Sequence, residues 1–91
     1  MISWVVLNQN DNVATALNDL PSGTTATIVD NLSIKLIEDV PYGFKFSIIG
    51  INKGDKIIKY GEAIGKASQD IIPGSVVHIH NVEGLRGRGD L

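Results

Sequence analysis

Short runs of β-branched and other apolar residues, separated by polar and glycine-rich breaks, dominate this chain. Runs of this kind predict β-strands. They occupy residues 3–7, 24–29, 32–37, 45–49, 56–60, 63–67 and 76–82. Asp30 and Asn31 separate the second run from the third, and both residue types tolerate positive φ. The pattern therefore predicts a β-hairpin at this point.

One stretch has helical periodicity instead. Four apolar residues share the spacing of one helical face: Val13, Ala16, Leu17 and Leu20. Asp11 or Asn12 can serve as the N-cap by accepting hydrogen bonds from the free amides of the first turn. Pro21 and Gly23 would end the helix. The pattern predicts one short helix within residues 11–20.

A glycine turn preceded by an apolar residue recurs along the chain. The turns end at Gly23, Gly43, Gly54 and Gly74, which are spaced 20, 11 and 20 residues apart. A glycine at positive φ after a buried aliphatic residue lets the chain fold back sharply. The spacing is too irregular for a solenoid. It predicts a compact, barrel-like domain of bent hairpins, so the expected fold class is mainly β with one short helix.

Composition narrows the functional classes. A chain of 91 residues allows one domain, and its formal net charge of −2 argues against nucleic acid as the main partner. The absence of cysteine excludes a disulfide framework and a thiolate metal site. No apolar run approaches the ~20 residues of a membrane span, and residues 1–7 lack the features of a signal peptide. We therefore expect a cytoplasmic protein with no membrane partner.

The apolar pattern stops at Glu83. Residues 84–91 are rich in glycine and arginine, a composition typical of a mobile or partner-ordered tail. The predicted organisation is one domain over residues 1–83 and a flexible tail over residues 84–91.

His78 and His80 are candidate metal ligands. In a strand, residues two apart point to the same face, with Cα atoms roughly 6.5–7 Å apart. Both imidazoles could then reach one metal ion or one anionic substrate. The alternative is that one packs on the sheet and the other lies in solvent. Asn81, which follows them, is either a substrate contact or a turn residue at the end of the strand.

Lys59, Tyr60 and Gly61 are candidate substrate-binding residues. A lysine supplies a point charge and hydrogen-bond donors to a carboxylate, and a tyrosine hydroxyl can orient a substrate hydroxyl. Gly61 is typical of a turn that needs positive φ or a close backbone approach. The alternative is a solvated lysine and a tyrosine that covers a sheet edge.

Five lysines make the middle of the chain locally basic: Lys45, Lys53, Lys56, Lys59 and Lys66. Such a surface could steer a sugar acid toward the domain, or it could be an ordinary charged face. The sequence contains no recognisable catalytic set, since it has no phosphate loop, nucleophile elbow or paired acid and base carboxylates.

Four motifs together resemble the SAF domain of the altronate and galactarate dehydratases, to which the small subunits of sulfolactate sulfo-lyases are related. The motifs are Asp11-Asn12-Val13-Ala14-x-Ala16-Leu17, Val40-Pro41-x-Gly43-x-Lys45, Ile58-Lys59-Tyr60-Gly61-Glu62-x-Ile64-Gly65 and His78-Ile79-His80-Asn81. The resemblance implies a β-clip fold and the role of small subunit of a hydro-lyase that is inactive alone. It also implies a large catalytic subunit as partner, a sugar acid such as altronate or galactarate as substrate, and a divalent metal, iron or manganese, in the assembled enzyme.

The chain departs from the family pattern at Asn8 and Phe44, where relatives often have histidine. If those histidines serve the active site in relatives, this protein has a changed substrate, a changed metal site or no activity. Two alternatives therefore stay open beside the lyase subunit: a non-enzymatic module that binds acidic sugars, and a structural subunit with a degenerate site. The substrate, the metal and the oligomeric state, including a homo-oligomer, are also left open.

Overall fold

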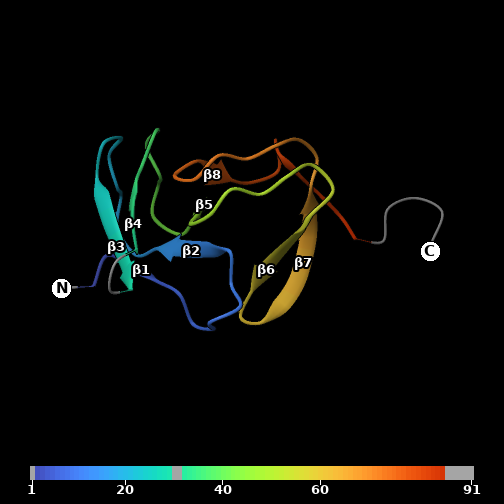
Figure 1. The fold of residues 1–91 in the computed structure, drawn as a ribbon. Coiled ribbons are helices and arrows are strands. Elements are labelled where there is room, and N and C mark those ends of the chain that lie inside the picture. The colour runs from blue at the N-terminus through green and yellow to red at the C-terminus, as the bar shows by residue number, and fades with distance from the viewer. Residues whose placement is uncertain (1, 30–31, 86–91) are drawn as a thin grey trace.

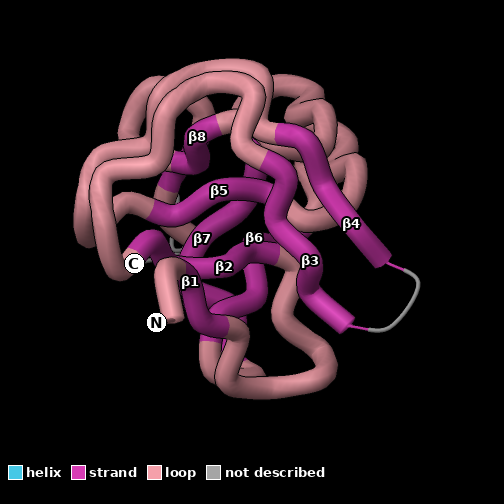
Figure 2. Tube along the Cα trace, turned by 90° about the vertical axis from the view of Figure 1, so that its left-hand side faces the viewer, coloured by secondary structure: helices cyan, strands magenta, loops and turns pink. Residues whose placement is uncertain are grey.

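The computed structural model describes residues 2–29 and 32–85, which form short strands joined by long turns (Figure 1). The strands are β1 (Trp4–Val5), β2 (Val13–Ala16), β3 (Thr25–Val29), β4 (Leu32–Lys35), β5 (Lys45–Ser47), β6 (Lys56–Lys59), β7 (Glu62–Ala67), β8 (Val76–Val77) and β9 (Val82–Glu83). These described residues contain no helix (Figure 2), and so none long and apolar enough to cross a bilayer. The predicted mainly β class is confirmed.

Antiparallel pairing gathers the strands into three small sheets. Their strand orders are β1-β2-β5-β8, β3-β4 and β6-β7-β9. The pairing of β3 with β4, which places Thr25 opposite Lys35, confirms the predicted hairpin. The expected tip of this hairpin, Asp30 and Asn31, lies outside the described residues. Residues 86–91 of the predicted tail also lie outside them.

The predicted helix within residues 11–20 is wrong, because residues 13–16 form β2. Residues of this strand pack into two different hydrophobic clusters. Ala14 and Ala16 pack in one with Phe46, whereas Val13 packs in the other with Ile57. A strand sends successive side chains to opposite faces, but a helix would bury a single stripe. Burial on both sides therefore overrides the helical spacing of the sequence.

The four glycine turns have the same geometry. They lie in segments 16–24, 36–44, 47–55 and 67–75, and their glycines have φ values of 90°, 86°, 92° and 90° in chain order. The segments associate in two pairs. Leu20 and Val40 exchange two backbone hydrogen bonds of 2.7 and 2.8 Å, and Ile51 and Ile71 exchange two of 2.7 and 2.9 Å. The repeat in the sequence thus corresponds to two copies of one paired-turn unit.

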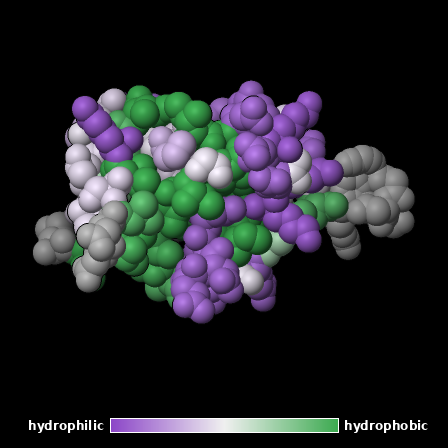
Figure 3. Space-filling view, viewed as in Figure 1, coloured by the Kyte–Doolittle hydropathy of each residue, from purple (hydrophilic) through white to green (hydrophobic). Residues whose placement is uncertain are grey.

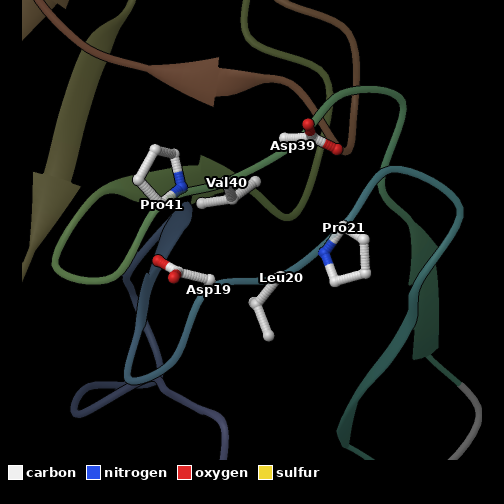
Figure 4. A pocket seen from close by; sticks show the side chains of 6 residues that line it. All are labelled: Asp19, Leu20, Pro21, Asp39, Val40 and Pro41. Atoms are coloured by element: carbon white, nitrogen blue, oxygen red, sulfur yellow. The ribbon is translucent and has the colours of Figure 1, made fainter.

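Aspartate side chains cross-link the first pair of turns. Asp19 Oδ1 accepts a hydrogen bond of 2.8 Å from the Tyr42 amide, and Asp39 Oδ1 accepts one of 2.8 Å from the Ser22 amide. The two segments run side by side in opposite directions, with these aspartates at opposite ends (Figure 4). A pocket of about 290 Å³ lies between them.

The second pair of turns keeps only one of these cross-links. Asp70 Oδ1 accepts a hydrogen bond of 2.8 Å from the Lys53 amide. The other cross-link would join Gly50, which corresponds to Asp19, and Pro73, which corresponds to Tyr42. Gly50 has no carboxylate to accept a hydrogen bond and Pro73 has no N–H to donate one. The acceptor and the donor are missing together, so no backbone amide is left unpaired there.

The two paired-turn units meet at Gly74. Its carbonyl accepts a hydrogen bond of 3.1 Å from the Ile37 amide. A Cβ on Gly74 would collide with the backbone carbonyl of Lys35 and approach Leu36 Cα to 3.3 Å. Glycine is required here for the close approach as well as for its φ of 90°.

We expect Gly50→Asp and Pro73→Ser together to restore the missing cross-link. The new carboxylate can accept a hydrogen bond from the new amide, and a Cβ at Gly50 meets nothing within 4 Å. Urea denaturation of the wild type, both single variants and the double variant should give a favourable coupling free energy of about 1 kcal/mol. Strict additivity of the two substitutions would contradict the proposed equivalence of the four turns.

Candidate functional site

The segment that carries both histidines is a turn. β8 ends at Val77, and residues 78–81 fold back before β9 begins at Val82. The predicted continuous strand over residues 76–82 is wrong, because Asn81 caps this turn. Asn81 Oδ1 accepts a hydrogen bond of 2.9 Å from the His78 amide, and Nδ2 donates one of 2.8 Å to the Val76 carbonyl.

Asn81 is buried, at 4% exposure, and both polar atoms of its side chain are engaged within its own turn. Such side-chain bonds offer the backbone an alternative to a strand ladder. The geometry therefore matches the interpretation of Asn81 as a turn residue. Its role as a substrate contact stays a prediction.

His78 and His80 have different surroundings. His78 is half-buried, and its ring stacks on Phe44 with centroids 4.4 Å apart and an angle of 28° between the planes. Stacking covers one face of the imidazole but leaves the two nitrogens, which lie in the ring plane, without a hydrogen-bond partner among residues 2–29 and 32–85. His80 is exposed in the turn. The shared strand face expected for the two histidines is therefore absent.

These residues do not fit a complete divalent metal site. Protein sites for zinc use three or four side-chain ligands. Within the described ranges no group of three or more His, Cys, Asp and Glu side chains is placed to share a metal ion. Iron or manganese, which the family resemblance implies, would need further ligands from outside the described residues.

Lys59, Tyr60 and Gly61 lie at the turn between β6 and β7. Tyr60 has φ 57° and Gly61 has φ 78°, the pair of positive values found in type I′ hairpin turns. Positive φ is uncommon for a bulky residue such as tyrosine. The Lys59 ammonium lies 4.7 Å from the centre of the Tyr60 ring, which is half exposed.

Gly61 is held by two residues that follow β1. Its amide donates a hydrogen bond of 2.8 Å to Asp11 Oδ1. A Cβ on Gly61 would lie 2.7 Å from Asn8 Nδ2. The expected need for glycine at this turn is confirmed by its positive φ and this close approach. Asn8, one of the two departures from the family pattern, is thus packed against the Lys59–Tyr60 turn.

A pocket of about 270 Å³ contains both an ammonium and an imidazole. Its walls come from β5, β7, the 78–81 turn and β9, and its lining residues are Lys45, Ile64, His78, Ile79, Val82, Glu83 and Gly84. Glu83 forms an ion pair with Lys66, with Oε2 and Nζ 3.7 Å apart. Lys45 has no ion-pair partner within the described part of the chain. We call this cavity the Lys45 pocket.

The cationic character of the Lys45 pocket extends to Lys59. Burial lowers the pKa of Lys45, and the positive charge of Lys59 lowers it further. The fold thus brings a residue of β5 and one of β6 into electrostatic contact. Lys45 and His78, with aliphatic walls and the nearby charge of Lys59, can bind an anion that also carries polar groups, since the acidic lining residue Glu83 is paired with Lys66.

Among the five lysines, the sequence singled out Lys59 and not Lys45. Its neighbour Phe44, the second position where the family resemblance led us to expect histidine, stacks on the ring of His78. Only the pairing of β5 with β8, which sets Lys45 opposite Val77, brings this lysine to the histidine turn. The chain motif Gly43-x-Lys45 was the one local signal that pointed to it.

Comparison with known proteins supports the family resemblance. Residues 2–85 match the family model described as the altronate/galactarate dehydratase SAF domain. The chain is 45% identical to the altronate dehydratase of Escherichia coli over 80 residues and 37% identical to that of Bacillus subtilis over 83 residues. These matches cover 88% and 91% of this chain but 16% of each relative.

A shorter relative has a different organisation. The (2R)-sulfolactate sulfo-lyase subunit alpha of Paracoccus pantotrophus is 39% identical over 59 residues, which is 63% of this chain and 88% of that subunit. A domain of this kind therefore occurs both as a small part of a long polypeptide and as most of a named subunit. The chain belongs to the family of SAF domains of altronate and galactarate dehydratases.

Proposed function

We propose that this chain is the SAF component of a hydro-lyase that removes water from a sugar acid such as altronate or galactarate. In this proposal it acts as a small subunit and adds substrate contacts to a large catalytic chain. The match to the SAF family model over residues 2–85 carries the proposal. The subunit alpha of Paracoccus pantotrophus supports an organisation in which such a domain is a separate chain.

The Lys45 pocket supports a carboxylate-bearing substrate. Removing water from a hydroxy acid takes a proton from the carbon next to the carboxylate, so negative charge develops on the carboxylate oxygens. An ammonium placed beside those oxygens stabilises that charge more strongly as it grows. Lys45 is suited to this role because it is half-buried and free of an ion pair within residues 2–29 and 32–85.

His78 and the β6–β7 turn have supporting roles in this proposal. The ring nitrogens of His78, held by stacking on Phe44, would hydrogen-bond to substrate hydroxyls. Lys59 and Tyr60 would contact the distal part of the substrate, with Gly61 shaping their turn. The base and most metal ligands would come from the large chain, because the described residues offer neither a three-ligand cluster nor a paired set of acid and base.

A non-enzymatic module for acidic sugars is the second candidate function. The stacking of Phe44 on His78 favours it, since Phe44 occupies a position where relatives often have a histidine and cannot transfer a proton. In that case the Lys45 pocket would bind a sugar acid without turnover in any complex.

Reconstitution should separate these functions. We expect the isolated chain to leave altronate and galactarate unchanged, and a complex with a large dehydratase chain that lacks its own SAF domain to dehydrate a sugar acid. Lys45→Gln should lower kcat/KM of the complex by about 10- to 150-fold, the loss of a charged hydrogen bond. Lys35→Gln, at an exposed lysine on β4, is the matched control. Turnover by the isolated chain, or full activity with Lys45→Gln, would refute the assignment.

The pH profile should report the protonation of Lys45. Substrate binding needs its ammonium form, so activity falls as the pH rises through the pKa of Lys45. Because burial and the charge of Lys59 lower this pKa, the fall comes at lower pH than for an ordinary lysine. Lys59→Gln removes one of the two causes and should move the alkaline limb of kcat/KM to higher pH. An unmoved limb would show that Lys45 does not control it.

Metal binding should depend on the complex. We expect calorimetry with Zn²⁺, Fe²⁺ and Mn²⁺ to find weak binding by the isolated chain, since residues 2–29 and 32–85 provide no three-ligand group. Binding should be tighter in the complex and weaker again in the His78→Ala, His80→Ala double variant. Tight binding by the isolated chain would contradict the need for a partner, and unchanged binding by the double variant in the complex would exclude both histidines as ligands.

A further inference from the structure

A third cavity, of about 400 Å³, lies on a different part of the domain. One wall is aliphatic and the other consists of the polar loop after β1. The lining residues are Val6, Asn8, Gln9, Asn10, Asp11, Asn12, Ile28, Val29, Leu32, Ile48 and Ile49. None of these lines the Lys45 pocket. We call this cavity the amide cleft.

Hydrogen bonds to β6 and within the loop itself fix the polar wall of the amide cleft. Asn12 Oδ1 accepts a hydrogen bond of 2.8 Å from the Ile58 amide, and its Nδ2 donates one of 2.9 Å to the Lys56 carbonyl. Asn8 Oδ1 accepts a hydrogen bond of 2.8 Å from the Asn10 amide. The wall is thus tied both to β6 and to itself, and is formed before any partner binds.

Unused hydrogen-bonding groups remain on this wall. Asn8 Nδ2 and the side-chain amides of Gln9 and Asn10 have no hydrogen-bond partner within the described ranges. Each amide group offers donors, and Gln9 and Asn10 also offer a carbonyl acceptor. These are the groups that pair with the N–H and C=O of a peptide backbone.

The opposite wall exposes aliphatic surface. Val29 is 60% exposed and Ile49 is 48% exposed. In the view of Figure 1, a hydrophobic area covers the side of the molecule where β1 and the end of β3 lie, and borders the hydrophilic loop after β1 (Figure 3). A contiguous apolar area of this kind marks an interaction site.

Few of the described residues that line the amide cleft are charged. Within residues 2–29 and 32–85, Asp11 is the one charged lining residue, and this residue is 8% exposed with its Oδ1 accepting a hydrogen bond from the Gly61 amide. A charged segment that entered would lose its hydration without finding an opposite charge, which is costly. The cleft is complementary to an uncharged aliphatic segment whose peptide groups meet the free amides.

We propose that the amide cleft is where the large catalytic chain docks, through an uncharged aliphatic segment in extended form. This inference rests on the proposed function, in which such a chain exists. The altronate dehydratases that this chain resembles have 84% of their length outside the matched region, since the match covers 16% of each. Docking at the amide cleft leaves the Lys45 pocket, which shares no lining residue with it, open to substrate.

Two matched isoleucines provide the test. Ile49 on the cleft and Ile37 away from it are 48% and 50% exposed, so lysine at either position should leave the fold intact, which circular dichroism and urea denaturation would check. The probe is a large dehydratase chain that lacks its own SAF domain, titrated by calorimetry. We expect Ile49→Lys to weaken binding about 100-fold or more, Val29→Lys to do likewise, and Ile37→Lys to change it less than 3-fold.

The outcomes distinguish this inference from the proposed function. If the wild-type chain does not bind the large chain, both fail. If it binds and Ile49→Lys binds equally well, the docking surface is wrong while the proposed function stands. If Ile49→Lys instead abolishes self-association seen by light scattering, the occupant is a second copy and the proposal is overturned. Lys45→Gln should bind as the wild type while losing turnover, which keeps docking and substrate contact separate.

Discussion

The reciprocal backbone hydrogen bonds between paired turns are the constraint on which this domain depends. Three strands, β1, β8 and β9, have two residues each, too few to be stable by sheet pairing alone. The bonds between Leu20 and Val40, and between Ile51 and Ile71, close the long turns on one another and bury all four aliphatic side chains. The glycine at the end of each turn makes this closure sterically possible, because its φ is near 90° in every case. Strands this short can be stable here because hydrogen bonds between the turns stabilise the fold in addition to those between the strands.

Side chains that follow β1 connect this framework to the site. Asn12 pairs with β6 through its backbone amide, which donates to the Ile58 carbonyl, and through both atoms of its side-chain amide. Asp11 holds the next turn by accepting from the Gly61 amide. These bonds fix the end of β6 beside β2, and through β2 beside β5. The charge of Lys59 can therefore act on Lys45, although the two residues belong to different sheets. The same loop forms the polar wall of the amide cleft on its other side.

Local signals in the sequence predicted local structure well. The β3–β4 hairpin and the glycine turns follow from residue types whose φ preferences act within a few positions. Two segments failed for reasons that only tertiary structure supplies. Residues 13–16 have helical spacing, but burial between two clusters selects a strand. Residues 76–82 have the β-branched composition of one strand, but the amide of Asn81 binds its own turn and divides them. For the candidate site, the sequence pointed to Lys59 and His78, whose roles stay predictions, whereas the place of Lys45 beside the histidine turn depends on the pairing of β5 with β8.

The two departures from the family pattern have different structural consequences. Asn8 lies against Gly61, and its Nδ2, which has no hydrogen-bond partner among the described residues, lines the amide cleft, so its side chain supports a turn and forms part of the cleft wall. Phe44 acts on the Lys45 pocket itself, because its ring holds His78 by stacking and offers no proton. A histidine at this position could exchange a proton with a neighbouring imidazole, and phenylalanine cannot. The Lys45 pocket therefore contains the imidazole of His78 but no second imidazole stacked on it, because position 44 holds a phenylalanine.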